Sequence, residues 1–356
     1  MRRIVVWVVM LCLLLSGCSS WMSGSYSSVE SHSEGSQLQD KPVLTVSSYT
    51  QLCKALISMV RDGTTRGVLS VQYAEEDEIR ADMDEAIQEI CRENPFAIYT
   101  VEEMSYECGS GSGGKTVSVK ITYLQNRVRA DQIQRVQNAE NAKQLIAQNL
   151  ENYEAGVVLY ADAMEAVDYA KVVEEYALAN PHTVMETPAV AVSYYPEQGQ
   201  QQVIEVKFTY QTSQEELRAL RNKVTPVFAS ALQHATGNWT AHDKVSRLYS
   251  FLMERYDEYR IQSSSTPAYS LLLHGVGDDR AFATVYGVMC RQAGINCRVI
   301  TGTYNGKPWA WNVVQLEGTE YYIDLLRCSQ ERKFSLRTWD EMKEYRWDAS
   351  AAPIAE

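Results

Sequence analysis

The sequence has few basic residues for its length and, beyond its first 15 residues, no long hydrophobic run. Its 356 residues include 33 Lys and Arg against 45 Asp and Glu, a formal net charge of −12. Because a phosphate backbone binds basic surfaces, this balance excludes nucleic acid as a partner. After residues 4–15 no hydrophobic run approaches the ~20 residues that span a bilayer, which excludes a polytopic membrane protein.

Histidine and metal-binding motifs are also scarce. The five His residues are scattered, and neither an H-E-x-x-H nor a C-x-x-C motif occurs. The adjacent pair Asp278 and Asp279 supplies too few oxygen ligands for a cation site. We therefore expect no metal and no cofactor.

The composition is otherwise that of an ordinary globular protein. Hydrophobic residues make up 45% and charged residues 22% of the chain, enough to bury a core. The length predicts about two to three domains. Six of the eight Cys residues lie beyond the N-terminal segment, and their many possible pairings leave the disulfides open. These six are Cys53, Cys91, Cys108, Cys290, Cys297 and Cys328.

The N-terminus has the features of an export signal. Two arginines precede the hydrophobic residues 4–15, a run too short to remain in the membrane as a helix. The sequence Leu-Ser-Gly-Cys at residues 15–18 then resembles the lipobox of bacterial lipoproteins. This resemblance implies that Cys18 carries a diacylglyceryl group and that residues 1–17 are removed as a signal peptide. The alternative is an ordinary signal with a chance cysteine.

Residues 18–44 form a Ser-rich stretch without periodicity, which predicts a flexible tether. Two or three acyl chains on a lipoprotein give stable anchoring. The lipobox resemblance therefore implies a protein on the cell membrane, exposed outside the cytoplasm. Its partners would be an extracellular peptide, a protein or a cell-wall component.

Two stretches in the middle of the chain, residues 45–137 and 138–224, share a sequence pattern. Matching segments recur at a spacing of 86–89 residues, which indicates tandem repeats. Each stretch is expected to fold as an α-β-α-β-β unit that spaces or binds, with Asn94 and Pro95 ending the second helix of the first unit. The matching segments are residues 56–57 with 145–146, 67–68 with 156–157, 94–95 with 180–181, and 120–123 with 207–210.

One motif satisfies a nucleotide-binding pattern. Residues 109–116 read Gly-Ser-Gly-Ser-Gly-Gly-Lys-Thr and match G-x-x-x-x-G-K-[ST], the P-loop. A P-loop opens a helix whose N–H groups face the phosphates. Here residues 117–123 alternate between apolar and polar side chains, which predicts a strand. We therefore expect a hairpin loop and no nucleotide.

The last third of the chain contains several motifs in a fixed order. They are Gly-Val-Gly-Asp-Asp-Arg-Ala-Phe-Ala at residues 275–283, Val-Tyr-Gly-Val-Met-Cys at 285–290, Gly-Ile-Asn-Cys-Arg-Val-Ile-Thr-Gly at 294–302, Trp-Ala-Trp-Asn-Val-Val at 309–314 and Tyr-Tyr-Ile-Asp at 321–324. Over residues 225–347, before a tail at 348–356, this order resembles the transglutaminase-like (papain-like) superfamily. The resemblance implies helices packed on an antiparallel sheet, so the fold class expected for the whole chain is α+β.

The family uses a Cys, a His and an Asp for catalysis, and two of these positions are replaced here. The resemblance places Asp279 in the Cys position, Trp309 in the His position and Asp324 in the Asp position. A carboxylate is a poor acyl nucleophile, and an indole cannot accept a proton at neutral pH. We therefore expect no catalytic activity, and we interpret Asp279 as the N-cap of its helix.

Two further groups of residues have open interpretations. Trp309, Trp311 and Asn312 either pack into the core or form the aromatic floor of the former cleft, for a peptide or a glycan. Cys290 lies on a hydrophobic helix stripe and is expected to be a core thiol. A relocated nucleophile at Cys290 is the alternative.

These observations favour a surface-anchored lipoprotein whose transglutaminase-like domain binds or scaffolds at the cell envelope without catalysis. An active hydrolase or acyltransferase that uses a relocated thiol is the competing hypothesis. A spacer without a ligand is the third.

Overall fold

The computed structural model describes residues 44–111, 114–255 and 268–348. The expected signal peptide, the expected lipidation site Cys18 and nearly all of the expected tether lie outside the described residues. Within those three ranges, no helix is long and apolar enough to cross a membrane.

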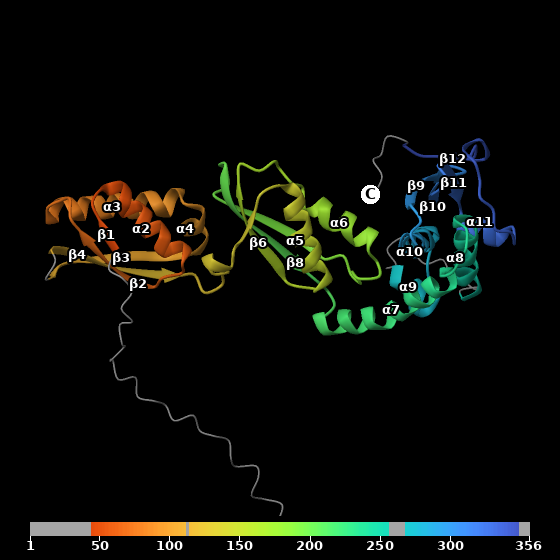
Figure 1. Ribbon diagram of the computed structural model, residues 1–356, viewed down its shortest axis with the longest axis horizontal. Coiled ribbons are helices and arrows are strands. Elements are labelled where there is room, and N and C mark those ends of the chain that lie inside the picture. The colour runs from red at the N-terminus through yellow and green to blue at the C-terminus, as the bar shows by residue number, and fades with distance from the viewer. Residues whose placement is uncertain (1–43, 112–113, 256–267, 349–356) are drawn as a thin grey trace, which may run out of the picture. The chain divides into compact units, whose positions relative to one another are not determined.

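The first α/β unit is a four-stranded sheet with helices on one face (Figure 1). Its strand order is β1-β2-β4-β3, in which β1 pairs parallel with β2 and the other neighbours are antiparallel. The helix α3 ends where the sequence predicts, because Asn94 caps the following helix and Pro95 occupies its first turn. The elements are β1 (Leu44–Val46), α2 (Tyr49–Arg61), β2 (Arg66–Val71), α3 (Glu76–Glu93), α4 (Pro95–Thr100), β3 (Val101–Gly111) and β4 (Gly114–Tyr123).

The second α/β unit has the same strand order as the first. Its sheet runs β5-β6-β8-β7, again with one parallel pair followed by two antiparallel pairs. The tandem duplication of one unit stays a prediction. The elements are η1 (Ala130–Gln132), β5 (Gln134–Val136), α5 (Ala139–Glu151), β6 (Gly156–Asp162), α6 (Tyr169–Ala179), β7 (Ala189–Tyr195) and β8 (Gln201–Thr209).

Both units differ from the expected α-β-α-β-β order. Each sheet begins with a three-residue strand, β1 or β5, that precedes the first helix, and the first unit also contains the short helix α4. Three residues are too few to show the alternation that predicts a strand. Because β5 pairs with β6 and ends before residue 138, the second unit begins earlier than the expected boundary.

The C-terminal region is a set of helices packed on an antiparallel sheet, as expected. The strand order is β11-β10-β9-β12. The elements are α7 (Gln214–Ala235), α8 (Ala241–Arg255), α9 (Ala268–His274), α10 (Asp279–Gln292), β9 (Cys297–Tyr304), β10 (Lys307–Leu316), β11 (Thr319–Ile323), α11 (Leu325–Gln330), η2 (Trp339–Glu341) and β12 (Tyr345–Arg346).

The long helix α7 crosses the boundary that we expected between residues 224 and 225. It begins at a capping box in which Ser213 and Glu216 satisfy each other's backbone N–H groups. Its first half holds the second α/β unit, since the Arg221 guanidinium donates to the Glu151 carbonyl at 2.6 Å. Its second half packs Phe228 into the C-terminal core. The two regions therefore share a helix rather than a linker.

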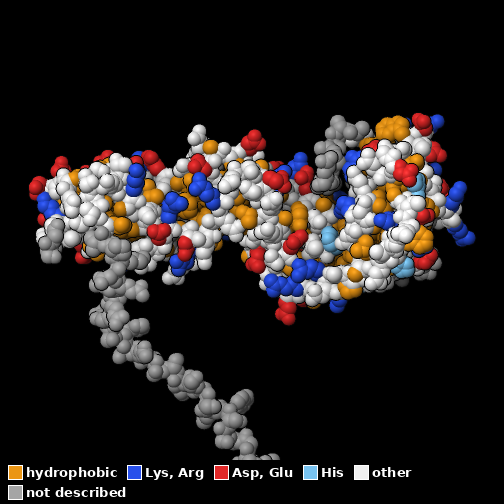
Figure 2. Space-filling view, in the orientation of Figure 1, with side chains coloured by type: hydrophobic (Ala, Val, Ile, Leu, Met, Phe, Trp, Pro, Cys, Tyr) orange, Lys and Arg blue, Asp and Glu red, His pale blue; other side chains and the backbone are white. Residues whose placement is uncertain are grey.

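The C-terminal sheet is covered by hydrophobic side chains on both faces. One face packs against α7, α8 and α10, and the other carries a smaller cluster around Trp311 and Tyr345. Charged side chains of both signs are spread over the surface between small hydrophobic patches (Figure 2). The residues of the predicted catalytic positions lie on the sheet and helices between these two clusters.

Candidate functional site

The N-terminus of α10 carries two adjacent acidic residues with different contacts. Asp278 is the N-cap, because its carboxylate accepts the Ala281 N–H at 2.9 Å. Asp279 is the first residue of the helix. The interpretation of Asp279 as the N-cap was therefore wrong by one residue. Either Asp can cap a helix, and the sequence has no further signal that separates them.

The side chain of Asp279 reaches the neighbouring sheet. Its Oδ2 accepts the backbone N–H of Ala310, on β10, at 2.5 Å. Burial raises the pKa of the Asp279 carboxyl, and the negative charges of Asp278 and Asp324 raise it further, whereas the Ala310 N–H lowers it. The carboxylate is thus held against β10 by a bond that favours its charged form.

Trp309 and Asp324 are joined by a direct hydrogen bond. The indole N–H of Trp309 donates to Asp324 Oδ2 at 2.8 Å. The Tyr345 hydroxyl donates to the same oxygen at 2.7 Å, and the Arg327 N–H donates to Oδ1 at 3.0 Å, which makes Asp324 the N-cap of α11. Burial and the adjacent carboxylate of Asp324 raise the pKa of Tyr345, so its phenol stays protonated as a donor.

The structure therefore brings the three predicted positions together along β10. Trp309 bonds to Asp324, and the next residue, Ala310, bonds to Asp279. Sequence reasoning missed Tyr345, which lies 21 residues beyond Asp324 and approaches it only because β12 pairs with β9.

This arrangement keeps an orienting hydrogen bond and lacks a base. In a Cys-His-Asp site the acid accepts an N–H of the imidazole, whose other nitrogen takes the proton of the thiol. The Trp309 indole supplies the same kind of N–H to Asp324, but it has no second nitrogen and accepts no proton. Asp279 presents a carboxylate that is already bonded to the backbone.

The expected cleft residues Trp311 and Asn312 are inside the protein. Both are 0% exposed, so neither can form the floor of an open cleft. Trp311 packs edge-on against Tyr345, and the Asn312 amide donates to the Ala283 carbonyl at 2.8 Å. A side chain at Gly302 would overlap the Arg346 carbonyl of β12, so this glycine lets that strand cover Trp311. Trp309 is half-buried.

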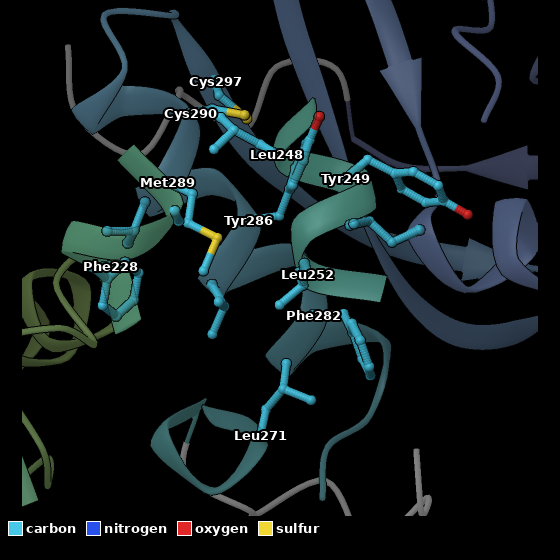
Figure 3. Close-up of a cluster of buried hydrophobic side chains, with 14 of the residues drawn as sticks. Phe228, Leu248, Tyr249, Leu252, Leu271, Phe282, Tyr286, Met289, Cys290 and Cys297 are labelled. Carbon is cyan, nitrogen blue, oxygen red and sulfur yellow. The ribbon is translucent and has the colours of Figure 1, made fainter. Parts of the chain in front are cut away.

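Cys290 lies in the C-terminal core, 0% exposed, in agreement with its interpretation as a core thiol. Figure 3 shows it beside Cys297 and above Tyr286 and Met289. Burial raises the pKa of Cys290 well above its ordinary value, and contact with the Cys297 thiol raises it further. The structure shows all six of the cysteines beyond the N-terminal segment as free thiols.

The P-loop pattern falls on the β3–β4 hairpin. Residues 114–116 begin the strand β4, and no helix follows them directly. The Lys115 ammonium bonds to the Ala74 carbonyl at 3.0 Å and to the Glu75 carboxylate. Within the described ranges, no group of three or more His, Cys, Asp or Glu side chains is arranged to hold a metal ion.

Residues 229–347 match the family model of the transglutaminase-like superfamily. A candidate cysteine protease from Cytophaga hutchinsonii is similar, with 13% identity, a TM-score of 0.26, and coverage of 47% of this chain and 72% of that chain. A candidate protease from Parabacteroides distasonis has 10% identity, a TM-score of 0.23, and coverage of 72% and 39%. A TGase structure has 10% identity, a TM-score of 0.25, and coverage of 62% and 63%.

No curated protein matches the chain. The family match carries the assignment, and residues 229–347 are a transglutaminase-like domain.

Proposed function

We propose that this protein is a surface-anchored lipoprotein whose transglutaminase-like domain has lost catalysis and binds or organises partners at the cell envelope. The observation that carries the loss of catalysis is the hydrogen bond from Trp309 to Asp324. An indole occupies the position of the base and uses its single polar atom as a donor.

The chemistry of acyl transfer supports this proposal. Thiol catalysis needs a thiolate to attack the carbonyl carbon and a base to take the thiol proton. Asp279 offers a carboxylate and Trp309 offers no lone pair. Loss of the nucleophile or the base from such a unit reduces turnover by a factor on the order of 10⁶.

The burial of Cys290 disfavours the competing enzyme. A reactive cysteine is partly exposed and has a lowered pKa. Cys290 has the opposite environment, since it is fully buried and its pKa is raised.

Contacts between the regions favour a binding or scaffolding role. Arg127, which follows the first sheet, pairs at 2.5 Å with the buried Glu205 of the second. The Arg291 guanidinium of the C-terminal domain donates to the Ala179 carbonyl of the second unit at 2.7 Å. Such contacts link each unit to the next, which supports a role in which the units act together.

The loss of catalysis is tested on the purified mature protein. We expect neither amine incorporation into a glutamine peptide nor peptide hydrolysis above a buffer control. Turnover that disappears in Cys290→Ala, and survives in Cys108→Ala, which removes a half-buried thiol of the first α/β unit, would establish the relocated-thiol enzyme instead.

The anchor is tested separately in cells. Cys18→Ala should abolish labelling by a radioactive fatty acid and leave residues 1–17 attached. Cys12→Ala removes a thiol from the same N-terminal segment and should change neither labelling nor cleavage. Normal cleavage and membrane retention of Cys18→Ala would contradict the lipobox interpretation.

A further inference from the structure

A cleft of about 620 Å³ lies where α2 of the first α/β unit faces the start of the second unit. This volume is in the range of small-molecule sites. Apolar side chains form part of its wall, and three basic side chains are placed around it. The lining residues are Lys54, Ile57, Ser58, Arg61, Asp62, Phe96, Ala130, Asp131, Ile133, Arg135 and Tyr160.

The three cations come from two elements that face each other across the cleft. Lys54 and Arg61 are seven residues apart on α2, so they lie on the same face of the helix. Arg135 lies on β5. Figure 2 shows Lys and Arg side chains gathered beside hydrophobic ones over the region of α2 and α4.

Two aromatic rings hold the guanidinium groups in place. The Arg61 guanidinium lies 5.6 Å from the ring centroid of Phe96, and that of Arg135 lies 5.7 Å from the ring centroid of Tyr160. The two rings contact each other at 4.7 Å between centroids. Stacking on a ring leaves the in-plane N–H groups of a guanidinium available for another partner.

One of the three cations is in an ion pair. Among the described residues, Lys54 and Arg61 form no ion pair, whereas Arg135 pairs with Asp162 at 3.9 Å. The wall also holds two acidic residues. Asp62 accepts the Ser58 hydroxyl at 3.3 Å, and Asp131 pairs with Arg129, which does not line the cleft, at 2.9 Å.

We infer that this cleft binds a phosphate monoester carried on a small organic group. The three cations and two carboxylates in the wall leave a net charge of +1, and one of those carboxylates, Asp131, is paired with Arg129 outside the cleft. A phosphate monoester carries a charge of about −1.5 to −2 at pH 7 and three acceptor oxygens, so it can contact all three cations at once. Guanidinium forks fit phosphate oxygens, and the apolar wall of Ile57, Phe96 and Ile133 suits the organic part.

The inference is tested by calorimetric titration of the mature protein with phenyl phosphate, inorganic phosphate and phenol. We expect saturable binding of phenyl phosphate, weaker binding of inorganic phosphate and the weakest binding of phenol. Added salt should weaken the binding, because the cations are partly exposed. Absence of saturable binding by phenyl phosphate would overturn the site, and equal affinity for inorganic phosphate would overturn the role of the organic group.

Variants that each remove one positive charge test whether the ligand binds in the cleft. Arg61→Gln and Arg135→Gln should each lower the affinity for phenyl phosphate by about tenfold or more, since each removes a charge-assisted hydrogen bond. Arg66→Gln removes the same charge from β2, outside the cleft, and should leave the affinity unchanged. An equal loss in Arg66→Gln would show nonspecific attraction and contradict the inference. None of these outcomes depends on the activity of the transglutaminase-like domain.

Discussion

The transglutaminase-like site and the cleft beside α2 differ in whether their polar side chains have partners inside the protein. At the site, Asp279, Trp309 and Asp324 all bond to other groups of the domain. In the cleft, Lys54 and Arg61 have no ion-pair partner among the residues that the structure describes. Polar groups that satisfy one another stabilise a fold, whereas unpaired charges around a cavity are available to a ligand. The difference suggests that ligand binding resides away from the family's catalytic position.

The largest expected effect would come from rebuilding the missing groups. Asp279→Cys alone should give little turnover, because its thiol lacks a base. Adding Trp309→His supplies that base beside Asp324 and should raise turnover of a glutamine peptide by about 10²–10⁴-fold over the single variant. The control is Asp279→Cys with Trp309→Phe, which removes the indole without adding a base. Equal rates in the two double variants would show that the position no longer supports catalysis.

The next effect concerns the stability of the bonded site. Asp324→Ala leaves the donors of Trp309, Tyr345 and Arg327 without their acceptor inside the protein, so we expect a loss of about 3–5 kcal/mol in the free energy of unfolding. Asp324→Asn keeps an acceptor oxygen and should lose less. Arg61→Gln in the cleft should stay within about 0.5 kcal/mol of the wild type. Urea denaturation measures all three, and similar losses at Asp324 and Arg61 would remove the contrast between the two regions.

A smaller effect on stability is expected at Asp278, which caps α10, next to Asp279. Asp278→Ala removes the N-cap and should lower the free energy of unfolding by about 1 kcal/mol. Asp278→Ser provides another capping oxygen and should be close to neutral. A full loss in the Ser variant would mean that the charge of Asp278, rather than its cap, stabilises the helix.

The smallest effect is a pH dependence at Asp279. Folding raises the pKa of this carboxyl above its ordinary value of 3.8, so the folded protein binds the proton more tightly than the unfolded chain. The contribution of this group therefore favours folding at low pH and is lost as the pH rises from 3.8 through the folded pKa. Relative to Asp279→Asn, the wild type should become less stable over that rise. Thermal unfolding at a series of pH values checks the sign, and a wild type that gains stability relative to Asp279→Asn over that rise would contradict it.

Local patterns in the sequence predicted the elements that carry the site, but not its long-range contacts. The family resemblance of the motifs implied which positions Asp279, Trp309 and Asp324 occupy, and the structure shows that these positions meet. The alternation along β10 placed Trp309 and Trp311 on one face, yet it could not show that β12 returns to bury Trp311. Such pairing depends on tertiary contacts that no local period encodes.

The cleft beside α2 was not predictable for a similar reason. Lys54 and Arg135 are 81 residues apart in the chain, and each reads in isolation as an ordinary exposed charge. Only the contact between the two α/β units places them around one cavity. The strand that carries Arg135, β5, has three residues, too few for the alternation that predicts a strand.

The helix α7 determines how the protein unfolds. Its side chains Leu217 and Val224 belong to a core that also includes Tyr153 and Met185 of the second α/β unit. When α7 unravels, apolar surface becomes exposed in both regions at once, so neither region keeps its full stability alone. The second unit and the transglutaminase-like domain therefore unfold as one cooperative block, and a protease that cuts between residues 224 and 225 releases two damaged pieces instead of two domains.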